Sequence, residues 1–126
     1  MKKLLILILI FTGAAAQGAR PAYRLTSPDG RLTTTVALGD ALTYDIEYDG
    51  QTLMQPSAIG LKLSDGRVWG SSARIAKAVR TSSDAVLSSP FYRSSTVRDH
   101  YNGLTLKMRD NWSVEFRVYD DGVAYR

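Results

Sequence analysis

The chain has 126 residues, of which 44% are hydrophobic and 22% charged, and it contains no cysteine. The missing cysteines exclude a disulfide-stapled scaffold and a lipid-modified cysteine after a leader. The formal net charge is +4, but the arginines are scattered rather than clustered, so we do not expect the basic stripe of a nucleic-acid-binding protein.

The N-terminus predicts a secretory signal peptide over residues 1–19. Lys2 and Lys3 supply the positive start, residues 4–11 are uniformly apolar, and residues 12–16 end in small residues with the A-x-A pattern. We expect cleavage after Ala16 or Ala19 and a periplasmic or secreted protein. The apolar run is shorter than the roughly 20 residues that span a bilayer, so no membrane association is expected after cleavage. An uncleaved anchor or a core strand is the alternative interpretation.

Turn signals recur along the rest of the chain. Asx-Gly pairs stand at Asp29-Gly30, Asp49-Gly50, Asp65-Gly66, Asn102-Gly103 and Asp121-Gly122, and Gly39-Asp40 is a related pair. Such pairs accept the positive φ angles of tight hairpin turns. The spacing therefore predicts a series of β-hairpins.

The segments between these pairs alternate between apolar and polar residues. In each of four segments, every second residue falls on one mainly apolar face. These faces are formed by Leu32, Thr34, Val36 and Leu38; by Tyr44, Ile46 and Tyr48; by Leu104, Leu106 and Met108; and by Trp112, Val114, Phe116 and Val118. Period-two alternation is typical of antiparallel strands with one buried face. It predicts an all-β, antiparallel β-sandwich.

Residues 71–90 do not follow this pattern clearly. Ser71 or Ser72 could cap a helix, and Ile75 and Val79 lie on one helical face, but these two residues would also share a strand face. The composition of residues 71–80 slightly favours a helix. The Ser-rich stretch from Thr81 to Pro90 predicts irregular structure that ends at the proline.

The last turn predicts that the sandwich continues beyond the sequence. Asp121-Gly122 starts a hairpin whose return strand, residues 123–126, is shorter than most strands. We expect a front piece of a larger β protein, incomplete at its C-terminal end. An unpaired sheet edge at Val123 would favour self-association.

The sequence offers few candidates for chemistry, and we predict no catalytic and no metal-binding residue in it. His100 is the only histidine, and Asp99 would point to the opposite face of a strand. Asp45 and Glu47 share a strand face and could hold a cation or act as an acid/base pair, although a solvated face is the simpler interpretation. Glu115 shares a strand face with Arg117 and is interpreted as a participant in a cross-strand ion pair.

Phe91, Tyr92 and Arg93 are the candidates for carbohydrate contact. Flat aromatic faces stack on the apolar faces of sugars, and an adjacent arginine supplies planar donors. The alternative is that this cluster fills the end of the core.

One family resemblance rests on motifs in order along the chain: Leu25-Thr-Ser-Pro-Asp-Gly30, residues 42–50, Gln51-Thr-Leu-Met, residues 56–61, Ser89-Pro-Phe-Tyr-Arg93 and residues 116–126. From about Tyr23 to Arg126 the chain resembles the N-terminal domain of glycoside hydrolase family 97. The resemblance implies a galactose-mutarotase-like supersandwich that packs on a (β/α)8 catalytic barrel, followed by a smaller β domain. It also implies that Ala73 to Thr81 are extended.

The resemblance implies a function for the larger protein. The family cleaves α-linked glucosides or galactosides, uses calcium, and belongs to periplasmic glycan-degrading systems. Its catalytic carboxylates lie in the barrel, and the calcium-binding carboxylate from the N-terminal domain is expected after Arg126. Residues 20–126 are therefore expected to be a partial sandwich domain of a secreted glycoside hydrolase. Its partners would be an oligosaccharide and the (β/α)8 domain, and it would have no activity or cofactor of its own. A free-standing carbohydrate-binding or adhesion module is the alternative.

Overall fold

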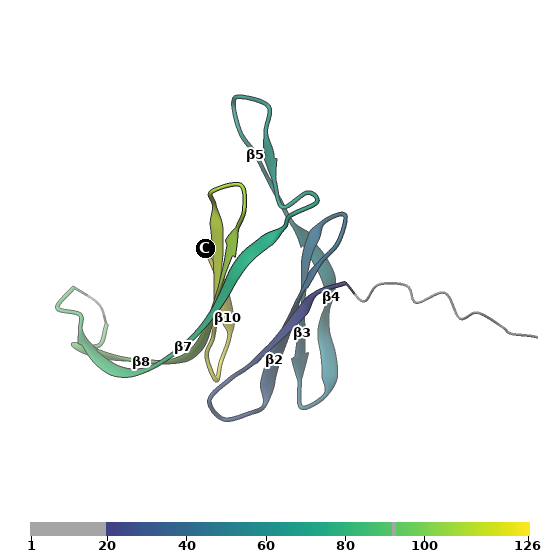
Figure 1. Cartoon of the computed structure of the whole chain (residues 1–126). Helices are drawn as coiled ribbons and strands as arrows, with labels where there is room; N and C mark the ends of the chain where they lie inside the picture. Colours follow the sequence, from purple (N-terminus) through teal and green to yellow (C-terminus); the bar gives the residue numbers. More distant parts are fainter. Residues whose placement is uncertain (1–19, 92) are drawn as a thin grey trace, which may run out of the picture.

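The computed structural model describes residues 20–91 and 93–126, and the regular elements within them are all β-strands. Two four-stranded antiparallel sheets face each other, with the orders β1-β2-β3-β4 and β10-β9-β8-β7, and β5 and β6 form a separate hairpin (Figure 1). The strands are β1 (Ala22–Thr26), β2 (Leu32–Leu38), β3 (Leu42–Tyr48), β4 (Gln51–Ile59), β5 (Leu61–Lys62), β6 (Val68–Trp69), β7 (Ile75–Ser88), β8 (Thr96–Met108), β9 (Ser113–Val118) and β10 (Val123–Tyr125). The predicted all-β antiparallel sandwich is confirmed. In this part of the chain there is no helix with the length and apolarity to cross a membrane.

Most of the expected turns join neighbouring strands. The pairs at residues 29–30, 39–40, 49–50, 65–66 and 121–122 all lie between paired strands. Asp49 and Gly50 have φ angles of 48° and 77°. A two-residue hairpin loop whose twist matches that of the strands requires positive φ angles at both of its residues. Local turn chemistry therefore fixes these connections.

Asn102-Gly103 is the exception, because it lies inside β8 and the prediction of a turn there was wrong. Asn102 is paired with Ser82 of β7 and with Val118 of β9. Its side-chain amide donates to the Thr26 carbonyl oxygen at 2.8 Å, so the asparagine links β8 to β1 of the other sheet. A side chain at position 103 would collide with Thr81 Oγ1. The glycine therefore permits close packing between strands instead of a turn.

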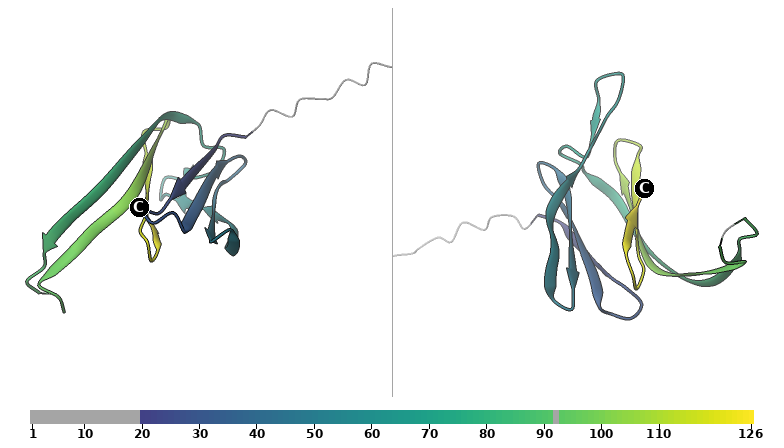
Figure 2. Two further views of the ribbon diagram at one scale, coloured as in Figure 1. Left: turned by 90° about the horizontal axis from the view of Figure 1, so that it is seen from below. Right: turned by 180° about the vertical axis from the view of Figure 1, so that it is seen from behind.

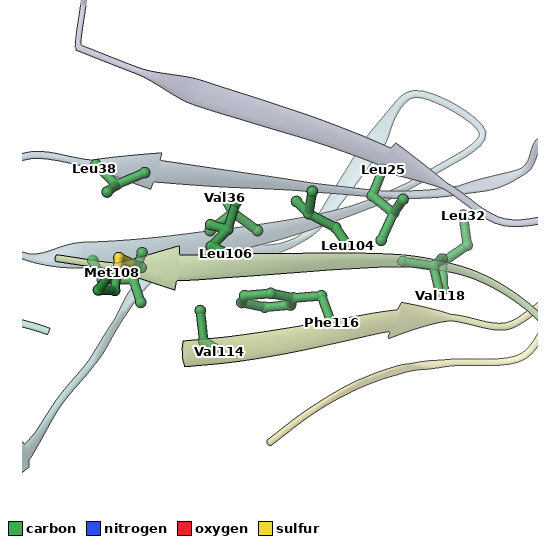
Figure 3. Packing of buried hydrophobic residues seen from close by; sticks show 11 residues of the cluster. Leu25, Leu32, Val36, Leu38, Leu104, Leu106, Met108, Val114, Phe116 and Val118 are labelled. Atoms are coloured by element: carbon green, nitrogen blue, oxygen red, sulfur yellow. The ribbon is translucent and has the colours of Figure 1, made fainter. Parts of the chain in front are cut away.

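The hydrophobic core lies between the two sheets, as Figure 3 shows. The sheet of β1 to β4 contributes leucines and a valine, and the facing sheet contributes alternate residues of β8 and β9. The buried residues are Leu25, Leu32, Val36, Leu38, Leu42, Leu104, Leu106, Met108, Val114, Phe116 and Val118. The alternation predicted from the sequence is thus confirmed for β2, β8 and β9.

Strands β7 and β8 are much longer than the others, and their distal halves leave the sandwich as a two-stranded ribbon (Figures 1 and 2). Residues 82–88 pair in regular register with residues 96–102. The prediction of irregular structure from Thr81 to Pro90 was therefore wrong as far as Ser88. Serine has weak intrinsic strand preference, but the antiparallel partner in β8 satisfies the backbone of this segment.

The start of β7 decides between the helix and the strand considered for residues 71–80. The chain is extended from Ile75 onward, so the helical alternative was wrong and the extended conformation implied by the family resemblance is confirmed. Ile75 packs against the core from the edge strand of its sheet. The spacing of four residues between Ile75 and Val79 fits a helix and a strand equally well. Pairing with β8 makes this segment a strand.

Phe116→Ala should remove the centre of the core. The Phe116 side chain is fully buried, and its ring lies 5.8 Å from Tyr44 and 5.6 Å from Tyr125 between centroids. We expect the free energy of unfolding, measured by urea denaturation, to fall by about 3–5 kcal/mol. Phe91→Ala is the matched control, since Phe91 is fully exposed and should cost less than about 0.5 kcal/mol. Equal losses in both variants would contradict the assignment of the core.

Candidate functional site

The end of the ribbon carries the carbohydrate-contact candidates from the sequence. Phe91 is fully exposed, and Arg93 also lies at the surface, whereas Tyr92 lies outside the described residues. The alternative that this cluster fills the core is therefore wrong for Phe91. Because its ring is free on both faces, Phe91 can stack on a flat partner such as a sugar ring.

Apolar side chains continue from Phe91 along the ribbon. Val86 is 71% exposed and Leu87 is 50% exposed, and Leu87 lies directly opposite Val97. An ion pair between Asp84 and Arg98, with an N–O distance of 2.8 Å, joins the two strands beside them. We call the exposed apolar residues Val86, Leu87, Phe91 and Val97 the ribbon-tip patch, in which Leu87 and Val97 share one face of the ribbon and Val86 lies on the other. Both ribbon strands contribute to it.

The outer face of the β10-β9-β8 sheet carries a second group of polar residues. Glu115 of β9 accepts hydrogen bonds from Arg117 Nε at 2.8 Å and from Arg126 Nε at 2.7 Å. These bonds to Arg117 and Arg126 lower the pKa of the Glu115 carboxyl, and the bond to Glu115 raises the pKa of Arg117. The cross-strand ion pair expected for Glu115 is therefore present, and its partner is Arg126, which follows β10 and lies opposite Glu115.

Two tyrosines extend this polar network to β8. The Arg117 guanidinium lies 4.5 Å from the centre of the Tyr101 ring, and Tyr119 packs against Tyr101 with centroids 5.4 Å apart. The Tyr119 hydroxyl donates to Asp99 Oδ1 at 3.1 Å. The charged and aromatic groups of this face thus contact one another, and the arrangement stabilises the sheet.

A cleft of about 380 Å³ is lined by the end of β4, the β5–β6 hairpin, the start of β9 and the end of β10. Trp69 and Trp112 stack there with their ring centroids 5.7 Å apart and an interplanar angle of 10°. Tyr125 lines the cleft and is 48% exposed. The Trp69 Nε1 donor is buried and has no hydrogen-bond acceptor among the described residues. The cleft is therefore aromatic and apolar, with one unpaired donor in its wall.

The other candidates from the sequence have structural partners. Asp45 Oδ1 accepts from the Thr35 backbone N–H at 2.9 Å, and Glu47 pairs with Arg24 at 3.4 Å. Both carboxylates therefore have partners within the fold. Within residues 20–91 and 93–126, no three potential ligand residues gather as a metal site requires.

His100 lies on the ribbon base and is partly exposed. Its Nδ1 is 3.8 Å from Asp120 Oδ2, while Asp99 binds Tyr119 on the opposite face. The strand geometry expected for these neighbouring residues is therefore confirmed.

Comparison with known families decides what kind of domain this is. The family model for the N-terminal domain of glycosyl hydrolase 97 matches residues 25–126, which is most of the chain. The chain belongs to glycoside hydrolase family 97. The resemblance noted in the sequence is thereby confirmed.

A curated relative and several solved structures are also similar to this chain. The chain is 48% identical over 126 residues to a retaining alpha-galactosidase of Bacteroides thetaiotaomicron, and it spans 19% of the length of that relative. Its fold matches a family 97 enzyme from Pseudoalteromonas sp. strain K8, solved in complex with panose, with a TM-score of 0.72 and 24% identity. A beta-arabinopyranosidase matches with a TM-score of 0.72 and 23% identity. Both structural matches cover 82% of this chain and 17% of the matched chain.

The sequence interpretation missed the position of Arg126 in this family 97 domain. The hairpin turn at residues 119–122 places Val118 opposite Val123, and counting back along β9 then places Arg126 opposite Glu115. The turn was recognised, so this register could have been derived from the sequence. The stacking of Trp69 on Trp112 brings together residues far apart in the chain, and no local pattern indicates it.

Glu115→Gln should reduce stability in a pH-dependent manner. Because the pKa of folded Glu115 lies below its ordinary value of 4.5, the ion pairs stabilise the fold above that pH. This stability is lost as the pH falls through the folded-state pKa. We therefore expect the unfolding free energies of the wild type and Glu115→Gln to differ at about pH 7, and we expect this difference to shrink as the pH falls below 4.5.

The measurement is urea denaturation across this pH range, with Lys62→Gln as a control at an exposed position on β5. The control should show no such convergence. A difference between wild type and Glu115→Gln that stays constant with pH would contradict the role of these ion pairs.

Proposed function

We propose that this chain forms the N-terminal β-sandwich part of a secreted glycoside hydrolase that acts on α-linked galactosides or glucosides. The single observation that supports this most strongly is the 48% identity to a retaining alpha-galactosidase over 126 residues. Of the two sugar classes, that relative favours α-galactosides. The predicted leader over residues 1–19 supports export to the periplasm or the medium.

In this proposal, residues 20–126 support catalysis but do not perform it. Hydrogen bonds from arginines lower the pKa values of Asp49, Asp65, Asp84 and Glu115. A general acid for glycoside hydrolysis needs a raised pKa, so these carboxylates are suited to structural ion pairs. The catalytic carboxylates implied by the family resemblance would then belong to a (β/α)8 domain, and the calcium-binding carboxylate of the N-terminal domain would also lie outside residues 20–126.

The ribbon-tip patch supports a direct contact with carbohydrate. Phe91 extends from the ribbon with its whole ring exposed, and Arg93 lies two residues later. An aromatic ring beside a guanidinium can stack on a sugar and donate to its hydroxyl groups. The same exposure favours the second candidate function, a free-standing carbohydrate-binding or adhesion module.

A chimera tests the first proposal. This chain would replace the matched segment of the Bacteroides thetaiotaomicron alpha-galactosidase, and hydrolysis of an aryl α-galactoside would be measured. We expect the chimera to be active, and we expect neither this chain alone nor the relative without the matched segment to be active. Hydrolysis by this chain alone, or an inactive but folded chimera, would contradict the proposal.

The Phe91→Ala variant of the chimera provides a separate measurement of sugar contact. If Phe91 binds substrate equally in the ground and transition states, KM for an α-galactosyl oligosaccharide rises while kcat is unchanged. Val68→Ala is the control, because Val68 is an exposed apolar residue on the separate β5-β6 hairpin. Equal KM values in the Phe91 variant and the control would leave the ribbon tip without a role in sugar binding.

A further inference from the structure

A basic cleft lies at one end of the sandwich, away from the ribbon-tip patch. It has a volume of about 800 Å³, and the ends of several strands meet around it. Arg20 precedes β1, Asp40 lies in the turn between β2 and β3, Arg74 precedes β7, and Arg109 follows β8. We call this region the arginine cleft.

The charges around the arginine cleft are unbalanced. Three guanidinium groups line it, and Asp40, the carboxylate in its wall, pairs with Arg20 at 3.5 Å while remaining almost fully exposed. Within the described part of the chain, neither Arg74 nor Arg109 has a carboxylate at ion-pair distance. Elsewhere in the same domain Arg31, Arg67, Arg98 and Arg117 each have one. The cleft therefore holds positive charge that an anionic group could neutralise.

The backbone around the cleft is fixed by hydrogen bonds. The Arg109 N–H donates to the Arg74 carbonyl oxygen at 2.9 Å, which holds these two residues side by side. The Ser72 N–H donates to the Asp40 carbonyl oxygen at 3.0 Å. Ser72 has a φ of 48°, an uncommon value for a residue with a side chain. A conformation of this kind persists only where the surrounding structure enforces it.

The remaining lining suits a sugar ring better than a free ion. Tyr23 and Ile75, which are only partly buried, provide an apolar surface beside the guanidinium groups. Binding sites for small ligands commonly combine an apolar wall with a few placed polar groups, at volumes of roughly 300–1,000 Å³. Guanidinium groups also bind planar carboxylates through paired hydrogen bonds.

We propose that the arginine cleft binds an acidic saccharide, whose anionic group lies between Arg74 and Arg109 and whose ring packs on the apolar wall. This inference extends the proposed glycan-related function to a class of ligand. The anionic group is a carboxylate of a uronic acid or a sulfate ester, since both have oxygens that accept from guanidinium donors. Cleavage of the leader after Ala19 would add an α-ammonium group at Arg20, beside the same cleft.

Isothermal titration calorimetry with the chain, expressed for export with its own leader, tests this proposal. The probes are a trigalacturonate, a sulfated galactose disaccharide, a neutral galactose oligosaccharide and inorganic sulfate. We expect at least one of the two acidic saccharides to bind, with an affinity that falls as salt rises, and we expect the neutral saccharide and inorganic sulfate to bind at least about tenfold more weakly. Which acidic saccharide binds more tightly identifies the anionic group.

The double variant Arg74→Gln/Arg109→Gln should weaken binding of the acidic saccharide by about tenfold or more, since it removes charge-assisted hydrogen bonds. Arg67→Gln is a control on another surface, where the arginine pairs with Asp65. Because both arginines are exposed, we expect the double variant to unfold at the same temperature as the wild type. This result would show that the variant is folded. Absence of binding, equal binding of inorganic sulfate, or an equal loss in the Arg67 control would overturn the proposal. Activity of the galactosidase chimera on a neutral substrate would leave the proposed function intact in each of these cases.

Discussion

The contact between the apolar faces of the two sheets holds the described structure together. Leu104, Leu106 and Phe116 of one sheet pack against Val36 and Leu42 of the other, and all five side chains are fully buried. Burial of such a side chain contributes about 1.5–3 kcal/mol, which is more than an exposed ion pair contributes. The ion pairs on the outer faces are partly or largely exposed and therefore adjust a fold that the core already determines.

Strand β8 connects this core to the surfaces that could bind ligands. Its residues from Leu104 to Met108 cover the core, and the Asn102 side chain then bonds to β1 at the point where the ribbon leaves the sandwich. Farther along the ribbon, residues 84–88 and 96–98 are exposed, and the ribbon ends in the ribbon-tip patch (Figure 1). The arginine cleft lies at the other end of β8, next to Arg109. The two candidate binding surfaces are thus separated by the length of one strand.

Local patterns in the sequence predicted the sandwich but not its long ribbon. Alternation identified the buried faces of β2, β8 and β9, and the Asx-Gly pairs identified most hairpin turns, because both depend on neighbouring residues. The Ser-rich part of β7 is a strand because β8 pairs with it, and Asn102-Gly103 is extended for the same reason. The sequence identified Phe91 and Arg93 as candidates for carbohydrate contact. It did not show that they are exposed, because their exposure depends on the pairing of β7 with β8. The arginine cleft escaped prediction, since its residues come from four separate parts of the chain.

Native-state hydrogen exchange tests most directly whether the core between the sheets holds the fold. The account predicts that amides of Leu104, Leu106 and Phe116 exchange only through global unfolding. Amides in the distal ribbon, such as those of Asp84 and Arg98, should exchange through smaller openings with a lower free energy, because their strands lie outside the core. Equal protection of the ribbon and the core strands, or faster exchange in the core strands, would contradict the account.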